Sequence, residues 1–336
     1  MRDPQRQFRP APLPRELLRP EADTTPDDAD TSSFEDAMPI VPIMSGDLLA
    51  MEIAPREMLM GPWLPRQGIT MVFAGRGIGK THLAMSIAYT VATGGTLMRW
   101  TAPASRRVLY VDGEMPLGSL QERLAGIVAG AGREPPEPDF LAFLPQDHYR
   151  DGLPDVASEA GQALIKHCAE GRDLVVFDNL SSLVRLKEND ADDWQPMQNL
   201  VLWLRRQGIS TLIVHHAGKG GGQRGTSRRE DVMDSVIELR RPDGYDPAEG
   251  ARFEVHFTKA RGFMGADAAP FLAAIVNGEG GAIRWRDEDL TADDKAVAFD
   301  MFANGAKATE VEKALGVGRA TAFRWQKAWK EGGGHG

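Results

Sequence analysis

Cysteine is almost absent from this chain of 336 residues, whose single cysteine is Cys168. One thiol excludes an internal disulfide framework and a zinc site built from several cysteines, and it suits a reducing compartment. No apolar run approaches the ~18 residues that are needed to span a bilayer, and the first residues do not form a signal-type hydrophobic region. We therefore expect a cytoplasmic protein that is neither secreted nor inserted into a membrane.

Basic charge is also in short supply. The 39 Lys and Arg residues are outnumbered by 48 Asp and Glu residues, which gives a formal net charge of −9. This balance argues against a nucleic-acid partner, because phosphate binding needs a basic surface. Net charge is an average, however, and two short segments described below are locally basic. Glycine, with 36 residues, is in excess and predicts loops where the backbone approaches another group closely.

The composition divides the chain into four parts. Residues 1–38 are rich in proline and acidic residues, and such a segment cannot offset its ordering entropy by burial, so we expect disorder. Residues 39–68 are more apolar but are interrupted by prolines, which suggests a strap that leads into the main domain. Residues 69–288 alternate short apolar runs with helical patterns, and residues 289–331 form a separate small helical pattern.

The alternation over residues 69–288 predicts an α/β domain with a mostly parallel central sheet flanked by helices. The expected strands are 69–74, 108–112, 140–144, 174–178 and 211–215. The expected helices are 80–93, 117–131, 157–170 and 193–207. Two later β-type runs, 232–240 and 253–259, have no helix between them, so we expect a mixed extension at one edge of the sheet.

A phosphate-binding motif lies at residues 74–81, which read Ala-Gly-Arg-Gly-Ile-Gly-Lys-Thr between an expected strand and an expected helix. It fits the P-loop pattern with alanine in place of the first glycine, and the alternative is a plain glycine-rich turn. Loop N–H groups and the helix N-terminus would bind phosphate oxygens, and Lys80 would supply a point charge for the β- and γ-phosphates. The predicted cofactors are ATP and Mg²⁺, with Thr81 as a metal ligand. The residues expected to bind the nucleotide are Gly75, Arg76, Gly77, Ile78, Gly79, Lys80, Thr81 and His82.

Two carboxylates would complete this site. Asp178 ends the apolar run 174–178, where a P-loop enzyme needs its second magnesium anchor, although an Asp after a strand is often a turn or cap residue. Glu114 follows the run 108–112 and would lie where the γ-phosphate projects. We therefore assign Glu114 as the general base, with Asp112 in support; a solvent-facing helix cap is the alternative for Glu114.

This order of motifs resembles the RecA-like P-loop ATPases, and most closely the RepA-type hexameric replicative helicases and related AAA family ATPases of bacterial mobile elements. The segment 212–219, Leu-Ile-Val-His-His-Ala-Gly-Lys, is similar to that family's histidine motif, in which one histidine senses the γ-phosphate. The resemblance implies this role for His216, with His215 as the second choice. Paired histidines could instead indicate a metal site, but adjacent strand residues point to opposite faces and cannot both bind one ion.

The next segment, 218–230, is glycine-rich and basic. In the RecA-like pattern the corresponding loop lines a central channel and contacts nucleic acid. The resemblance implies DNA contacts for Lys219, Arg228 and Arg229, and it makes Arg224 a candidate arginine finger. A solvated surface loop is the alternative.

A later segment, 257–262, is similar to the KxRxG element of the replicative helicases. Lys259 and Arg261 stand two apart and would lie on one face of a strand. The resemblance implies that they reach the γ-phosphate of a neighbouring subunit, so that hydrolysis depends on assembly. The alternative is a pair of charges that face solvent.

Residues 307–330 have the layout of a helix-turn-helix, with a short helix that ends at Gly316 and a second helix from about Arg319. They resemble resolvase and Hin-type modules, and Arg319, Thr321 and Arg324 are expected to contact base edges or phosphates. So small a unit needs Val297, Phe299 and Phe302 upstream as a third helix. A helical hairpin for capping or oligomerisation is the alternative.

Two functions remain open. The first is Mg²⁺-dependent ATP hydrolysis coupled to DNA binding and translocation by a ring-forming homo-oligomer, a hexamer in this family, on single-stranded DNA. The second is an ATP-switched DNA-binding regulator or loader that does not unwind DNA. A small-molecule kinase is disfavoured because no lid-like basic helix is visible and the C-terminal module would be unused.

Overall fold

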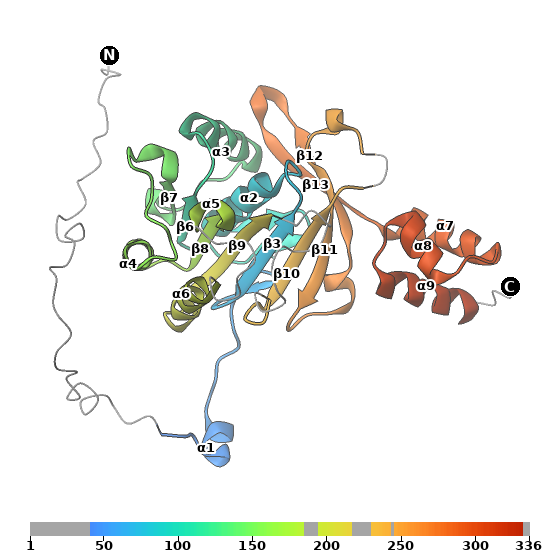
Figure 1. The fold of residues 1–336 in the computed structure, drawn as a ribbon, viewed down its shortest axis with the longest axis horizontal. Coiled ribbons are helices and arrows are strands. Elements are labelled where there is room, and N and C mark those ends of the chain that lie inside the picture. The colour runs from blue at the N-terminus through green and yellow to red at the C-terminus, as the bar shows by residue number, and fades with distance from the viewer. Residues whose placement is uncertain (1–40, 185–193, 217–229, 243–244, 332–336) are drawn as a thin grey trace. The chain divides into compact units, whose positions relative to one another are not determined.

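The structure is a computed structural model that describes residues 41–184, 194–216, 230–242 and 245–331 (Figure 1). The expected disorder of residues 1–38 falls outside these ranges. Contacts within the chain separate residues 1–55 from residues 56–336. In the first unit, α1 (Ser45–Ala50) is a short helix with exposed side chains. No helix in the described ranges is both long enough and apolar enough to cross a membrane.

A nine-stranded sheet, in the order β13-β12-β11-β10-β3-β9-β8-β6-β7, forms the centre of residues 56–289 (Figure 1). Six neighbouring strands pair in parallel, and three strands continue the sheet in antiparallel pairing at one edge. The α/β fold with a mostly parallel sheet and a mixed edge is therefore confirmed. The parallel strands are β3 (Ile69–Ala74), β6 (Val108–Asp112), β7 (Leu141–Pro145), β8 (Leu174–Asp178), β9 (Ser210–His216) and β10 (Ser235–Arg240). The antiparallel strands are β11 (Arg252–Ala260), β12 (Phe271–Asn277) and β13 (Ile283–Asp289).

The helices of the sheet domain follow the expected order. Two match the predicted ranges at both ends, namely α2 (Lys80–Thr93) and α3 (Leu117–Ala131). The other two are shorter than expected, namely α4 (Glu159–Cys168) and α6 (Gln195–Arg206). The start of α4 is fixed by Ser158, whose side chain accepts a hydrogen bond from the N–H of Gly161. A single-turn helix, α5 (Leu180–Leu183), follows β8.

The apolar core lies on both faces of the sheet. Along β3, the side chains of Ile69, Met71 and Phe73 pack into one cluster, and those of Val72 and Ala74 pack into the other. This alternation follows from the two-residue period of a strand. Because β3 lies between β9 and β10 and is covered on both sides, all six of its residues are buried.

Two short hairpin pairings were not predicted from the sequence, one in the strap and one directly after α2. β1 (Met58–Met60) pairs with β2 (Leu64–Pro65), and β4 (Gly95–Leu97) pairs with β5 (Trp100–Ala102). The rings of Trp63 and Trp100 meet edge to face, with their centroids 5.1 Å apart, and both are fully buried. The end of the strap thus belongs to the core of the sheet domain.

Three helices, α7 (Thr291–Ala303), α8 (Ala308–Leu315) and α9 (Arg319–Glu331), form the C-terminal module. Gly316, with φ of 60°, ends α8 in the left-handed conformation that glycine favours. The expected third helix is present as α7, and Phe302 lies in the shared core with Trp325. Val297 does not contribute as expected, because its side chain lies on the outer face and is 44% exposed.

The C-terminal module should depend on Phe302. Truncation of a buried Phe to Ala costs about 3–5 kcal/mol, and a module this small has little stability in reserve. We expect Phe302→Ala to remove amide hydrogen-exchange protection throughout α7, α8 and α9 while α2 and β3 stay protected. Val297→Ala, on the exposed face of the same helix, is the matched control and should change little. Retained protection of α9 in Phe302→Ala would contradict this view of the core.

Candidate functional site

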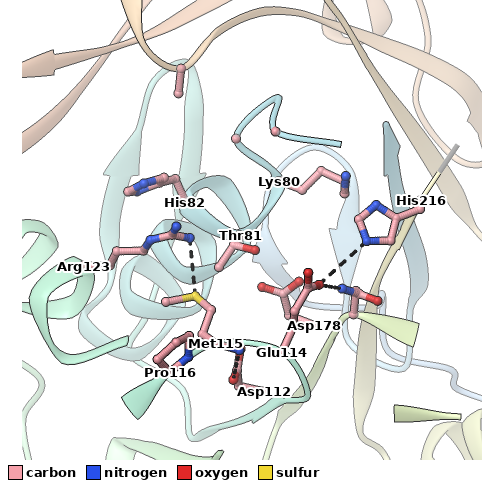
Figure 2. A pocket seen from close by; sticks show the side chains of 14 residues that line it. Lys80, Thr81, His82, Asp112, Glu114, Met115, Pro116, Arg123, Asp178 and His216 are labelled. Carbon is pink, nitrogen blue, oxygen red and sulfur yellow. Dashed lines mark hydrogen bonds and ion pairs between the residues drawn. The ribbon is translucent and has the colours of Figure 1, made fainter. Parts of the chain in front are cut away.

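The expected site residues meet where the parallel strands end. The register of the sheet pairs Ala74 with His216 and Asp112 with Asp178, so the loops after β3, β9, β6 and β8 start at one level. A cavity of about 490 Å³ lies at this edge (Figure 2). Its lining consists of Gly77, Gly79, Lys80, Thr81, His82, Asp112, Glu114, Met115, Pro116, Arg123, Asp178, Asn179, His216 and Ala251.

The P-loop has the backbone that its glycines allow. Gly77 and Gly79 take φ values of 70° and 116°, in the region that side chains disfavour. A Cβ at Gly79 would also come within 3.0 Å of the Cβ of Ala251. Of the remaining predicted residues, Gly75 and Arg76 are exposed outside the cavity, and the Ile78 side chain is buried in the core. The residues of the motif that line the cavity are therefore Gly77, Gly79, Lys80 and Thr81.

Lys80 lies at the base of the loop. Its ammonium donates hydrogen bonds to the carbonyl oxygens of Ala74, at 3.1 Å, and Gly75, at 2.7 Å. Burial lowers the pKa of Lys80 to about 8, although the carboxylates of Asp178 and Glu114 act in the opposite direction. A desolvated cation at a helix N-terminus is suited to the oxygens of a polyphosphate.

Thr81 and Asp178 form an oxygen-lined pair. The Asp178 carboxylate accepts a hydrogen bond from the Thr81 hydroxyl and another from the Tyr110 hydroxyl, which lies 2.6 Å from Oδ2. Burial raises the pKa of Asp178 because the charged form is desolvated. Hydroxyl and carboxylate oxygens are the hard ligands that Mg²⁺ takes together with phosphate oxygens and water. These two residues therefore fit a phosphate-bound Mg²⁺ ion, and no cluster of three protein metal ligands is needed or found among the described residues.

The Glu114 carboxylate lies beside that of Asp178 and is contacted by two side chains (Figure 2). The amide nitrogen of Asn179 donates to Oε2 of Glu114, and Nε2 of His216 lies 3.8 Å from the same oxygen. Asn179 also accepts, through Oδ1, the N–H of Ser182 at 3.2 Å and so caps α5. Sequence analysis missed Asn179, although its position directly after Asp178 was a signal that could have been used.

Asp112 supports the turn that carries Glu114. Its Oδ2 accepts the N–H of Met115 at 2.9 Å, and burial raises its pKa to about 6. Asp112 also lines the cavity next to Asp178. The expected supporting position of Asp112 agrees with this geometry.

The side chains of the two histidines of β9 point to opposite faces of the strand, as expected for adjacent residues. His216 lines the cavity, and burial together with the nearby Lys80 charge lowers its pKa, which favours the neutral ring. His215 is 4% exposed and is not part of the cavity lining. Of the two histidines, His216 is therefore the one whose position fits the predicted contact with a nucleotide.

Two arginines that sequence analysis did not single out contact the site. Arg123 of α3 lines the cavity and donates to the sulfur of Met115 at 3.3 Å. Arg241, just after β10, donates to the carbonyl oxygen of Gly77 at 3.2 Å. Both come from elements far from the P-loop in sequence, so no local motif points to them.

Lys259 and Arg261 lie at the other end of the sheet. Lys259 pairs with Val236, which is level with Met71 near the start of β3, whereas the P-loop follows the end of β3. The Lys259 ammonium donates to the carbonyl of Glu230, and Arg261 donates to that of Asp231 at 3.2 Å. The expectation that both lie on one strand face was wrong, because β11 ends at Ala260 and Arg261 follows it. Burial lowers the pKa of Lys259.

The expected DNA-contacting residues fall into two groups. Lys219, Arg224, Arg228 and Arg229 lie outside the described residues. In the C-terminal module, Arg319 and Arg324 are exposed on α9, whereas Thr321 is half-buried. Phe323 is exposed between them, and the Arg319 guanidinium lies 5.6 Å from its ring centroid.

Fold and site together define a P-loop ATPase that carries a C-terminal helix-turn-helix. Comparison with known families agrees: residues 35–222 match the AAA domain family, and residues 289–335 match the homeodomain-like domain family. The first match covers more than half of the chain, so this protein belongs to the AAA domain family. Among solved structures it is similar to a KaiC-like protein from the hyperthermophilic archaeon Pyrococcus horikoshii OT3, with 18% identity and a TM-score of 0.46 over 66% of this chain and 90% of that chain.

The contact between Asn179 and Glu114 leads to a kinetic prediction. Asn179→Ser keeps an oxygen that can cap α5 but is too short to hold Glu114, so kcat should fall about tenfold while KM for ATP stays within about twofold. Glu114→Gln should lower kcat by about 10²–10⁴. In the Glu114→Gln background, Asn179→Ser should have no further effect, because the partner it positions is already disabled. Equal losses in both backgrounds would show that Asn179 does not act through Glu114.

Proposed function

We propose that this protein is a Mg²⁺-dependent ATPase that acts on DNA as a ring-forming homo-oligomer, a hexameric helicase of the RepA type. The observation that carries the proposal is the separation of Lys259 and Arg261 from the phosphate site of their own chain. Two cations at the far end of the sheet cannot contact a phosphate that is bound in the cavity of the same subunit. They could contact the γ-phosphate in a neighbouring subunit if the far end of one sheet faced the cavity of the next subunit.

The chemistry within one subunit follows from the cavity. Lys80 and the N–H groups of the P-loop would bind the β- and γ-phosphates. Thr81 and Asp178 would hold a magnesium ion, which would supply positive charge to the phosphate oxygens. Glu114 orients the attacking water and takes its proton. His216 would sense the γ-phosphate, and its Nε2, 3.8 Å from Oε2 of Glu114, supports this role.

A neighbouring subunit would complete the transition-state site. Lys259 or Arg261, or Arg224 from the segment outside the described residues, would place positive charge on the γ-phosphate. Such fingers contribute about 10³–10⁵ in kcat in related chemistry. Head-to-tail contacts of this kind generate rings when the rotation closes. Hydrolysis would thus be linked to assembly.

DNA would bind at two places. Lys219, Arg228 and Arg229 would contact the backbone of single-stranded DNA in the channel of the ring, where the segment 218–230 follows directly after His216. Arg319, Thr321 and Arg324 of α9 would contact duplex DNA. The exposed positions of Arg319 and Arg324 support the second contact, whereas half-buried Thr321 is the weaker candidate.

One observation favours a second candidate function, an ATP-switched DNA-binding regulator or loader without unwinding activity. The C-terminal helices have a complete apolar core of their own, and α9 exposes basic side chains without acidic residues between Arg319 and Lys330. A module of this kind is sufficient for duplex binding. ATP hydrolysis would then reset assembly on duplex DNA.

Mixing two inactive variants tests the shared site. Lys80→Ala should abolish hydrolysis because it removes the positive charge that binds the phosphates. Arg261→Ala should lower hydrolysis strongly because it removes the arginine finger. Mixed at equal amounts, they should recover up to about a quarter of wild-type ATPase activity, since one interface in four joins an intact P-loop to an intact finger. No recovery from variants that still co-assemble would contradict action between subunits. Undiminished hydrolysis by Lys80→Ala would overturn the ATP site itself.

Strand displacement separates the two functions. On forked DNA with ATP and Mg²⁺, a helicase should unwind the duplex and be stimulated by single strands, and Lys80→Ala should do neither. Arg324→Ala should reduce duplex binding and leave unwinding intact, because α9 is not part of the proposed channel. Duplex binding without unwinding by the wild-type protein would select the regulator.

A further inference from the structure

The cavity has a second end that the hydrolysis chemistry does not use. Lys80, Glu114 and His216 lie on one side of Thr81, and His82, Met115 and Arg123 lie on the other (Figure 2). These last three residues come from α2, from the turn after β6 and from α3. A ligand that binds through its phosphates at the first end would extend past Thr81 toward the second.

Arg123 at this second end has no carboxylate partner among the residues that the structure describes. Its guanidinium donates to the Met115 sulfur at 3.3 Å, and it forms no ion pair with any acid in the described part of the chain. A sulfur is a weak acceptor, so most of the hydrogen-bonding capacity of Arg123 is left for a ligand. The planar guanidinium is weakly hydrated and stacks on flat aromatic faces.

His82 and Met115 give this end an aromatic and apolar character. Nδ1 of His82 is buried and makes no hydrogen bond to the residues that the structure describes. Met115 is 8% exposed and offers a polarizable thioether. Together with Arg123 they provide flat and polarizable surfaces, whereas the groups suited to phosphate are at the other end.

A nucleoside has the properties that match such a wall. Its base is flat, uncharged and edged with hydrogen-bonding groups, and base stacking on aromatic or guanidinium planes is tolerant of geometry. The whole cavity, at about 490 Å³, is within the range of pockets that enclose small ligands. A purine presents a larger stacking face than a pyrimidine.

We propose that His82, Met115 and Arg123 form the nucleoside subsite of the cavity, with the Arg123 guanidinium stacked on a purine base. This inference rests on the proposed nucleotide site and specifies which end of it selects the base. Arg123 is a specificity-determining residue here, and it leaves the binding of phosphate to the P-loop.

The test compares a whole nucleotide with its phosphate part. Dissociation constants of ATP, CTP and inorganic tripolyphosphate are measured with Mg²⁺ for the full chain and for Arg123→Ala and Arg123→Lys. The wild-type protein should prefer ATP to CTP. Both variants should bind ATP about tenfold more weakly and lose this preference, because both lack the planar guanidinium. Arg123→Lys keeps the positive charge and so separates the effect of stacking from that of charge. Tripolyphosphate binding should change by less than about twofold.

Gln121→Ala is the matched control, since Gln121 is exposed on the same helix and does not line the cavity. It should bind all three ligands like the wild type. Equal weakening of ATP and tripolyphosphate in Arg123→Ala would overturn the inference, because Arg123 would then contact phosphate. Unchanged ATP binding would overturn it too. If the wild-type protein bound neither ATP nor tripolyphosphate, the nucleotide site as a whole would be overturned instead.

Discussion

The parallel hydrogen-bond ladder that joins β3, β9, β8 and β6 is the interaction on which the site depends. It places Ala74 beside His216 and Asp112 beside Asp178, so four loops open at the same edge although they are far apart in sequence. The register is maintained by side-chain packing, because the strands are buried on both faces and a slip of one residue would exchange their side chains between the two differently packed apolar clusters. The chemistry of the cavity is thus secured by the apolar core behind it.

Burial has a second effect on the charged groups at this edge. It shifts the pKa values of Lys80 and Asp178 toward the neutral forms, Lys80 downward and Asp178 upward. In each case a nearby opposite charge or a hydrogen bond acts against the shift. Such a group of desolvated side chains is stabilised most by a ligand that brings both negative oxygens and a divalent cation, which is what a magnesium-bound triphosphate offers. The charged groups of the cavity therefore favour ligand binding more than they favour the stability of the folded protein.

Much of this arrangement was predictable from local sequence. The runs 69–74, 108–112 and 174–178 have the bounds of the strands, because buried parallel strands are continuous apolar segments that end abruptly at polar residues. The contacts that complete the cavity were not predictable in the same way. Asn179 meets Glu114 across 65 positions of sequence, and Arg123 enters from the middle of a helix, so each depends on loop paths that leave no periodic pattern. The end of β11 before Arg261 likewise reflects a bend that composition does not encode.

β11 joins the two ends of the sheet. Near its start, the Phe253 ring lies so close to Gly79 that a Cβ there would come within 3.1 Å of it, and near its end is Lys259. Six residues of extended chain separate these points by about 20 Å. In the proposed ring, this one stiff strand would touch the phosphate loop of its own subunit and the γ-phosphate of the next. Each nucleotide site of the ring would then be connected to the next by a single strand of one subunit.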